Sequence, residues 1–111
     1  MNMNYSSDLK FCVKLLELFK DNIPSELTQF NEAVQIKDYS LLASLAHKVK
    51  PSFQMVGLSD MSKAFKDLEL KAKENDEESI KIYKKINTEI HQSLTLIDNE
   101  IQNIKDYLAS L

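Results

Sequence analysis

One row of branched apolar residues in the last third of the chain constrains the fold more than any other feature. Its members recur at intervals of four or three positions: Ile82, Ile86, Ile90, Leu94, Ile97, Ile101, Ile104 and Leu108. On an α-helix this spacing places all of them within about 80° of one line. Because the intervals lack heptad regularity, they favour a buried core face over a coiled-coil dimer seam. We therefore expect a long amphipathic helix that packs against other helices.

The rest of the chain also indicates helices. One Gly and two Pro in 111 residues leave little of the turn chemistry that β-hairpins require. Apolar residues recur at helical spacing in segments 9–19, 24–35, 42–56 and 61–72. Short connections between helices favour antiparallel neighbours. The predicted fold is all-α, an up-and-down four-helix bundle with a short additional N-terminal helix, in a single domain that spans residues 1–111.

Pro24 is expected to separate the first two helices. A proline has no backbone N–H, and its fixed backbone angle suits the first position of a helix. Ser6, Ser7 and Asp8 can cap the first helix, over 9–19. The second helix is then predicted to begin at Pro24.

Charge and cysteine content exclude several classes of function. The net charge is −3, and the lysines alternate with acidic residues, which argues against a nucleic-acid surface. A single cysteine, Cys12, excludes an intramolecular disulfide and a Cys-based zinc cluster, and we expect it in or beside the core. Residues 1–8 are too polar for a signal peptide, and no apolar run approaches the roughly 20 residues that span a bilayer. We expect a cytoplasmic monomer with no nucleic-acid or membrane partner, no cofactor and no metal.

His47 is the candidate functional residue, because helical spacing places it opposite an apolar stripe. The stripe consists of Leu42, Leu45, Val49, Phe53 and Val56. The residues within about 60° of His47 are small or polar: Ala43, Ser44, Lys50, Pro51 and Gln54. We expect the imidazole to project from a solvent-facing patch. A neutral, exposed imidazole can act as a nucleophile.

Phosphoryl transfer fits such a histidine, because this chemistry requires positioning, access for a partner and positive charge near the phosphoryl oxygens. Lys50, three residues after His47, lies on the same helix face, whereas Lys48 is offset by about 100°. Gln54 could contribute a hydrogen bond one turn further along. We expect a partner to dock on the surface around the ring, formed by Ala43, Ser44, Lys48, Pro51 and Gln54.

Residues 46–52 read Ala-His-Lys-Val-Lys-Pro-Ser, with Val-Gly-Leu at 56–58 and Leu-Glu at 68–69. This pattern resembles the signature of histidine-containing phosphotransfer (HPt) domains, Ala-His-x-hydrophobic-Lys-Gly-Ser, then hydrophobic-Gly-Ala, then Leu-Glu. The resemblance implies a four-helix bundle in which His47 accepts a phosphoryl group and Lys50 supports it. The implied partners are receiver domains of response regulators, a hybrid sensor histidine kinase, or both.

Pro51 departs from this pattern, because the family usually has Gly there. It cannot donate to the His47 carbonyl, and its ring crowds that carbonyl, so we expect a kink or a looser helix beside the site. Several functions stay open. We favour a phosphorelay protein, because Lys50 and the small residues before His47 are retained. The alternative is a non-catalytic helical docking adaptor for a receiver domain or sensor kinase. A helical oligomerisation module built on the last helix is a third.

The remaining candidate residues have structural interpretations. His91 is expected to be a solvated or boundary residue on the flank of the last helix rather than a second phosphorylation site, because no lysine follows it at the spacing of Lys50 from His47. Met55 and Met61 are expected to pack in the core. No Gly-rich phosphate loop is present, so we expect a phosphoryl carrier without ATP-dependent kinase activity of its own.

Overall fold

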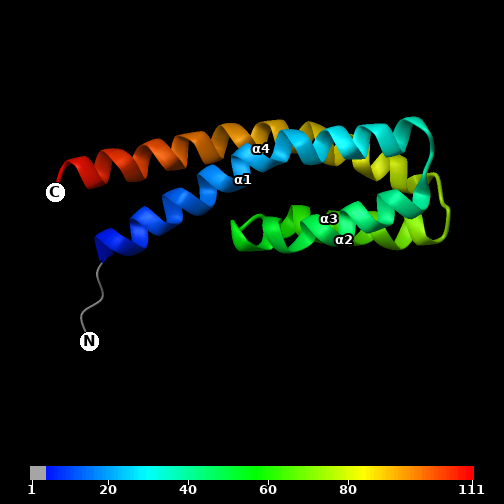
Figure 1. Cartoon of the computed structure of the whole chain (residues 1–111), viewed down its shortest axis with the longest axis horizontal. Helices are drawn as coiled ribbons and strands as arrows, with labels where there is room; N and C mark the ends of the chain where they lie inside the picture. The colour runs from blue at the N-terminus through cyan, green and yellow to red at the C-terminus, as the bar shows by residue number, and fades with distance from the viewer. Residues whose placement is uncertain (1–4) are drawn as a thin grey trace.

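The computed structural model describes residues 5–111, which form four helices that run alternately in opposite directions (Figure 1). The helices are α1 (Tyr5–Gln35), α2 (Tyr39–Met55), α3 (Ser59–Lys73) and α4 (Glu78–Ala109). The prediction of an all-α, up-and-down bundle is confirmed. Residues 1–4, part of the polar stretch in which no signal peptide is expected, lie outside the described residues. No helix within residues 5–111 combines the length and the apolar character needed to cross a membrane.

The expected short N-terminal helix is not a separate element, because segments 9–19 and 24–35 belong to the single helix α1. Pro24 lies inside α1 and leaves the carbonyl of Lys20 without its usual backbone donor. The residues on either side of the proline in the same stripe, Ile23 and Leu27, are both buried. An internal proline costs roughly 3 kcal/mol relative to alanine, and burial of this stripe offsets that cost and keeps the helix continuous.

A chain of aromatic rings joins all four helices in the core. Phe19 of α1 meets Phe53 of α2 edge-to-face, with ring centroids 5.0 Å apart, and Phe53 lies 4.9 Å from Phe65 of α3. Phe65 lies 5.4 Å from Phe30 of α1, which stacks on Tyr83 of α4 at 5.1 Å. Such pairs each contribute about 0.5–1.5 kcal/mol beyond the burial of their surface. The aromatic chain therefore fixes how the α2–α3 hairpin lies against α1 and α4.

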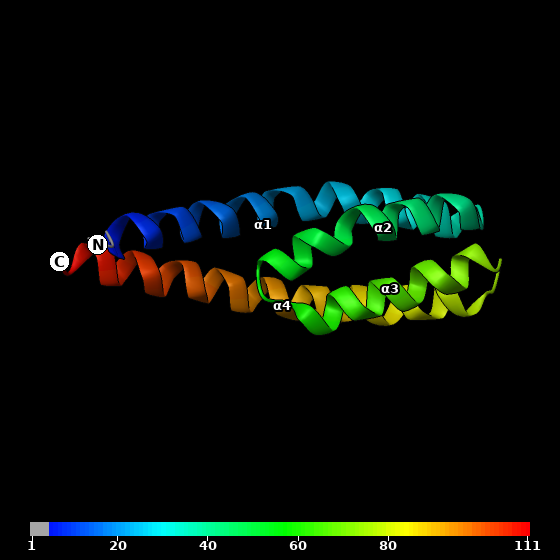
Figure 2. The same ribbon diagram turned by 90° about the horizontal axis from the view of Figure 1, so that it is seen from below.

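The isoleucine row of α4 is a core face, as its spacing predicts. Its buried members are Ile86, Ile90, Ile97 and Ile101, and the other four are partly buried. α1 and α4 extend together beyond the α2–α3 hairpin (Figure 2). Ion pairs join these two helices, Lys20 with Asp98 and Lys105 with Glu17.

Two packing predictions are wrong. Cys12 is exposed, whereas the next residue of α1, Val13, is buried, so Cys12 lies on the solvent side of the helix. Met55, in the last turn of α2, is 65% exposed and lies at the rim of a depression between α1 and α2. Met61 is buried and His91 is exposed, as predicted.

Local hydrogen bonds fix both ends of α2, the helix that carries His47. Asp38 caps the start of α2 by accepting a hydrogen bond from the backbone N–H of Leu41 at 3.0 Å. At the other end, Gly57 adopts φ +83°, a left-handed conformation that favours glycine, and the N–H of Leu58 then reaches the Phe53 carbonyl at 2.9 Å. α2 itself continues through Pro51 to Met55.

Candidate functional site

His47 lies on the outer side of α2, and its side chain is 73% exposed. The neighbouring residues Leu45, Ala46 and Val49 are buried against the rest of the bundle. The helical periodicity of the sequence predicts this orientation, because residues two before and two after His47 turn to the opposite face. The imidazole is therefore accessible to another protein.

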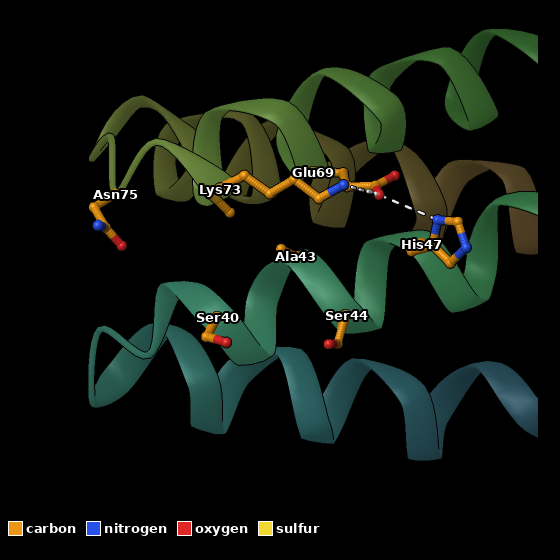
Figure 3. A pocket seen from close by; sticks show the side chains of 8 residues that line it. Ser40, Ala43, Ser44, His47, Glu69, Lys73 and Asn75 are labelled. Carbon is orange, nitrogen blue, oxygen red and sulfur yellow. Dashed lines mark hydrogen bonds and ion pairs between the residues drawn. The ribbon is translucent and has the colours of Figure 1, made fainter.

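A buried carboxylate lies directly behind the imidazole. Glu69 of α3, whose side chain is 6% exposed, has one oxygen, Oε2, at 3.1 Å from Nδ1 of His47 (Figure 3). The same oxygen is 3.1 Å from Nζ of Lys73, and the other oxygen, Oε1, is 2.6 Å from Nζ of Lys50. Burial of a carboxylate is costly unless the charge is paired. Glu69 meets this requirement with two ammonium groups and one imidazole.

The charge state of Glu69 follows from these contacts. The hydrogen bond from Lys50 lowers the pKa of the Glu69 carboxyl to about 2, with a further lowering by Lys73, and both outweigh burial, which raises it. The carboxyl group is therefore ionised at neutral pH and can only accept hydrogen bonds.

The ionised carboxylate determines the tautomer of His47. Because Glu69 cannot donate, the hydrogen bond requires the proton of the neutral ring to be on Nδ1. The lone pair is then on Nε2, the ring nitrogen on the far side from Glu69 (Figure 3), in a side chain that is largely exposed. The arrangement presents a nucleophilic nitrogen with a fixed orientation at the surface.

An open groove of about 500 Å³ runs beside His47 between α2 and α3; we call it the His47 groove (Figure 3). It is lined by Ser40, Ala43, Ser44, His47, Glu69, Ala72, Lys73 and Asn75. Ser44 is exposed, but the expectation that Ala43 faces solvent is wrong: it is only 7% exposed. α3 packs closely against this side of α2, so Ala43 forms part of the floor of the groove.

The other sequence-predicted residues lie in two different places. Lys50, Pro51 and Gln54 line a second depression on the other side of His47 along the α2–α3 seam. Lys48 is exposed and lies near Glu26 of α1, where its charge lowers the pKa of that carboxyl against the larger effect of burial, which raises it. Lys48 is thus the one member of the predicted docking surface that faces α1 rather than the seam.

Neither Glu69 nor Lys73 has a role assigned by the sequence patterns around His47. The Leu-Glu pair at 68–69 carries one available signal, because an acidic residue beside the buried Leu68 and one turn after the buried Phe65 needs a cationic partner. Lys73, one turn further on, then supplies part of that charge. Within residues 5–111 no group of three or more His, Cys, Asp or Glu side chains could hold a metal ion.

Comparison with known proteins gives one match. A family model described as Hpt domain matches residues 14–107, which include the whole of α2 and α3 and most of α1 and α4. No curated protein and no solved structure shows a significant match to the chain.

Proposed function

Because the chain belongs to the Hpt domain family, whose members act in histidine phosphotransfer, we propose that it carries a phosphoryl group on His47 between the partners of a two-component phosphorelay. The donors and acceptors are receiver-domain aspartates, with a hybrid sensor histidine kinase as a further source. The observation that carries the proposal is the exposed imidazole whose Nδ1 is held by a buried, ionised carboxylate.

The transfer step uses the lone pair of His47 Nε2. This nitrogen attacks the phosphorus of an aspartyl phosphate, the Nε2–P bond forms, and the P–O bond to the aspartyl oxygen breaks. The bonding electron pair leaves with that oxygen as a carboxylate. The proton on Nδ1 stays in place, and the positive charge that the ring gains lies against Glu69. Transfer to an acceptor aspartate is the reverse of this step.

The two lysines that bind Glu69 support the phosphoryl group in different ways. Lys50 is held by Oε1 of Glu69 and has two further N–H donors for phosphoryl oxygens. Lys73 shares Oε2 with His47, so its ammonium lies within two hydrogen-bond lengths of the ring, and its side chain is 60% exposed. A phosphoryl group carries a charge of about −2. We assign its neutralisation to both lysines.

A second candidate function is a docking adaptor that binds a receiver domain or kinase without accepting phosphate, and Pro51 is the observation that favours it. The geometry around Pro51 weighs against this candidate. α2 remains helical past the proline. His47 therefore stays on the same face of α2 as Lys50 and contacts Glu69. The relay function is therefore the better supported of the two.

Label transfer tests the proposal. The protein is incubated with a panel of receiver domains phosphorylated with ³²P, and label that survives alkali but not acid is measured on the wild type, His47→Gln and His91→Gln. We expect label on the wild type and on His91→Gln, whose histidine is exposed on α4, and none on His47→Gln. Equal labelling of wild type and His47→Gln refutes the relay, and normal receiver binding by His47→Gln without any labelling of the wild type supports the adaptor.

A further inference from the structure

The second depression on the α2–α3 seam is lined by cations. Its residues are Lys50, Pro51, Gln54, Ser62, Lys63 and Lys66, and its volume is about 380 Å³. None of the acidic side chains of residues 5–111 lines it. The hydroxyl of Ser62 donates to the Lys50 carbonyl at 3.2 Å, which ties α3 to α2 at this point. We call this feature the lysine depression.

The lysine depression adjoins the phosphotransfer site. Lys50 lines it and also binds Glu69, the carboxylate that holds His47. Along the antiparallel α2 and α3, the His47 groove, which His47 and Lys73 line, is therefore followed by the lysine depression, which Lys63 and Lys66 line. A partner protein whose active centre reaches His47 therefore comes close to both the His47 groove and the lysine depression.

Positive charge is concentrated along the α2–α3 seam, although the chain as a whole is acidic. The net charge of the whole chain is −3, yet Lys50, Lys63, Lys66 and Lys73 face the seam with Glu69 as the carboxylate between them. The other carboxylates of α3, Asp60 and Asp67, line different depressions. Lys50 and Lys73 are paired with Glu69, whereas Lys63 and Lys66 are exposed and pair with no carboxylate within residues 5–111.

We propose that Lys63 and Lys66 bind an acidic rim on the receiver domain that exchanges phosphate with His47, an inference that rests on the proposed function. Two unpaired cations beside the reacting nitrogen attract an acidic surface and orient it during the encounter. A protein is the better fit than a nucleic acid, because the chain as a whole is acidic and repels a polyanion that extends beyond the depression. Lys63 and Lys66 speed the association of the receiver domain with this chain, whereas the phosphoryl transfer itself depends on His47 and Glu69.

Charge reversal tests this proposal. The receiver domain that transfers fastest to the wild type, loaded with acetyl phosphate, is used with Lys63→Glu/Lys66→Glu and with the control Lys84→Glu/Lys85→Glu. The control makes the same charge change at exposed positions of α4, which lines neither depression. The second-order rate of transfer is measured at about 50 mM and about 300 mM salt, where the screening lengths differ by about 2.5-fold. Labelling of His47 by phosphoramidate, a small donor that needs no docking, is measured in parallel.

We expect the Lys63/Lys66 variant to transfer about tenfold more slowly at low salt, with a smaller deficit at high salt, while the control stays within about twofold of wild type. Phosphoramidate labelling is expected to be unchanged in both. Wild-type transfer rates in Lys63→Glu/Lys66→Glu, or in the milder Lys63→Gln/Lys66→Gln at low salt, overturn the proposal.

Two other outcomes also count against it. If the variant loses phosphoramidate labelling as much as it loses transfer from the receiver domain, the substitutions damage the His47 site itself and do not act on docking. Duplex DNA binding that the variant loses while its transfer rate stays at the wild-type value assigns the lysines to a nucleic acid. The proposed function fails separately, when neither phosphoramidate nor any receiver domain labels His47 of the wild type.

Discussion

Glu69→Gln is the most informative single substitution, because it removes one buried charge and keeps the size of the side chain. Lowering the pKa of this carboxyl from 4.5 to about 2 corresponds to roughly 3 kcal/mol of stability at neutral pH. Two of its three partners, His47 and Lys73, are largely exposed, so water screens part of that interaction. We expect Glu69→Gln to lower the free energy of unfolding by about 1–3 kcal/mol at pH 7.

The effect of Glu69→Gln depends on pH in a defined direction. A carboxyl with a lowered pKa in the folded state stabilises fully above its unfolded value of 4.5, and this stability is lost as the pH falls through about 2. The difference between wild type and variant is therefore largest at neutral pH and shrinks to about 1 kcal/mol or less near pH 3.

Urea unfolding at pH 7, 5 and 3 measures this difference, with Glu100→Gln as the control. Glu100 is exposed on α4 and pairs with no lysine within residues 5–111, so its substitution should change stability by less than about 0.5 kcal/mol at each pH. A penalty for Glu69→Gln that is equal at pH 7 and pH 3, or the absence of any penalty, refutes the account of Glu69 as a buried ionised group.

Three further substitutions test other parts of the account. Pro51→Ala supplies a backbone donor for the His47 carbonyl; we expect the free energy of unfolding to rise by about 1–3 kcal/mol with labelling of His47 retained, and a fall in stability would contradict this. Phe53→Ala removes a ring that contacts two others in the core, so urea unfolding should show a loss of about 3–5 kcal/mol, whereas a loss below about 1 kcal/mol would mean that the aromatic chain does not hold the hairpin. Lys50→Gln should slow transfer to His47 by about tenfold or more in the receiver assay, while Lys48→Gln, which alters a lysine that faces α1, should not, and equal effects would refute the role of Lys50.

The orientation of His47 was predictable because it depends only on the period of one helix. The apolar stripe of α2 turns toward the bundle, and the imidazole follows on the opposite side. The core face of α4 was predictable for the same reason. When the direction of a side chain depends on one helix alone, the spacing of apolar residues along the sequence is sufficient to predict it.

Glu69 and Ala43 show where this reasoning ends. Their surroundings depend on how closely α3 packs beside α2, which the period of neither helix specifies. Glu69 meets His47 across 22 positions of sequence, and Ala43 becomes part of a floor because α3 covers it. Pro24 shows a related limit, since a local rule that favours a helix start is overridden by burial of Ile23 and Leu27.

We propose that His47 accepts the phosphoryl group on Nε2 while the proton stays on Nδ1 and is donated in a hydrogen bond to Glu69. Long-range ¹H–¹⁵N spectra of protein labelled with ¹⁵N-histidine, recorded before and after phosphorylation, measure both nitrogens directly. We expect an Nδ1-protonated ring for His47 before transfer and phosphorus coupling to Nε2 of the same ring afterwards. Phosphorus coupling to Nδ1, a His47 ring protonated on Nε2 alone before transfer, or a phosphorylated His91 would contradict it.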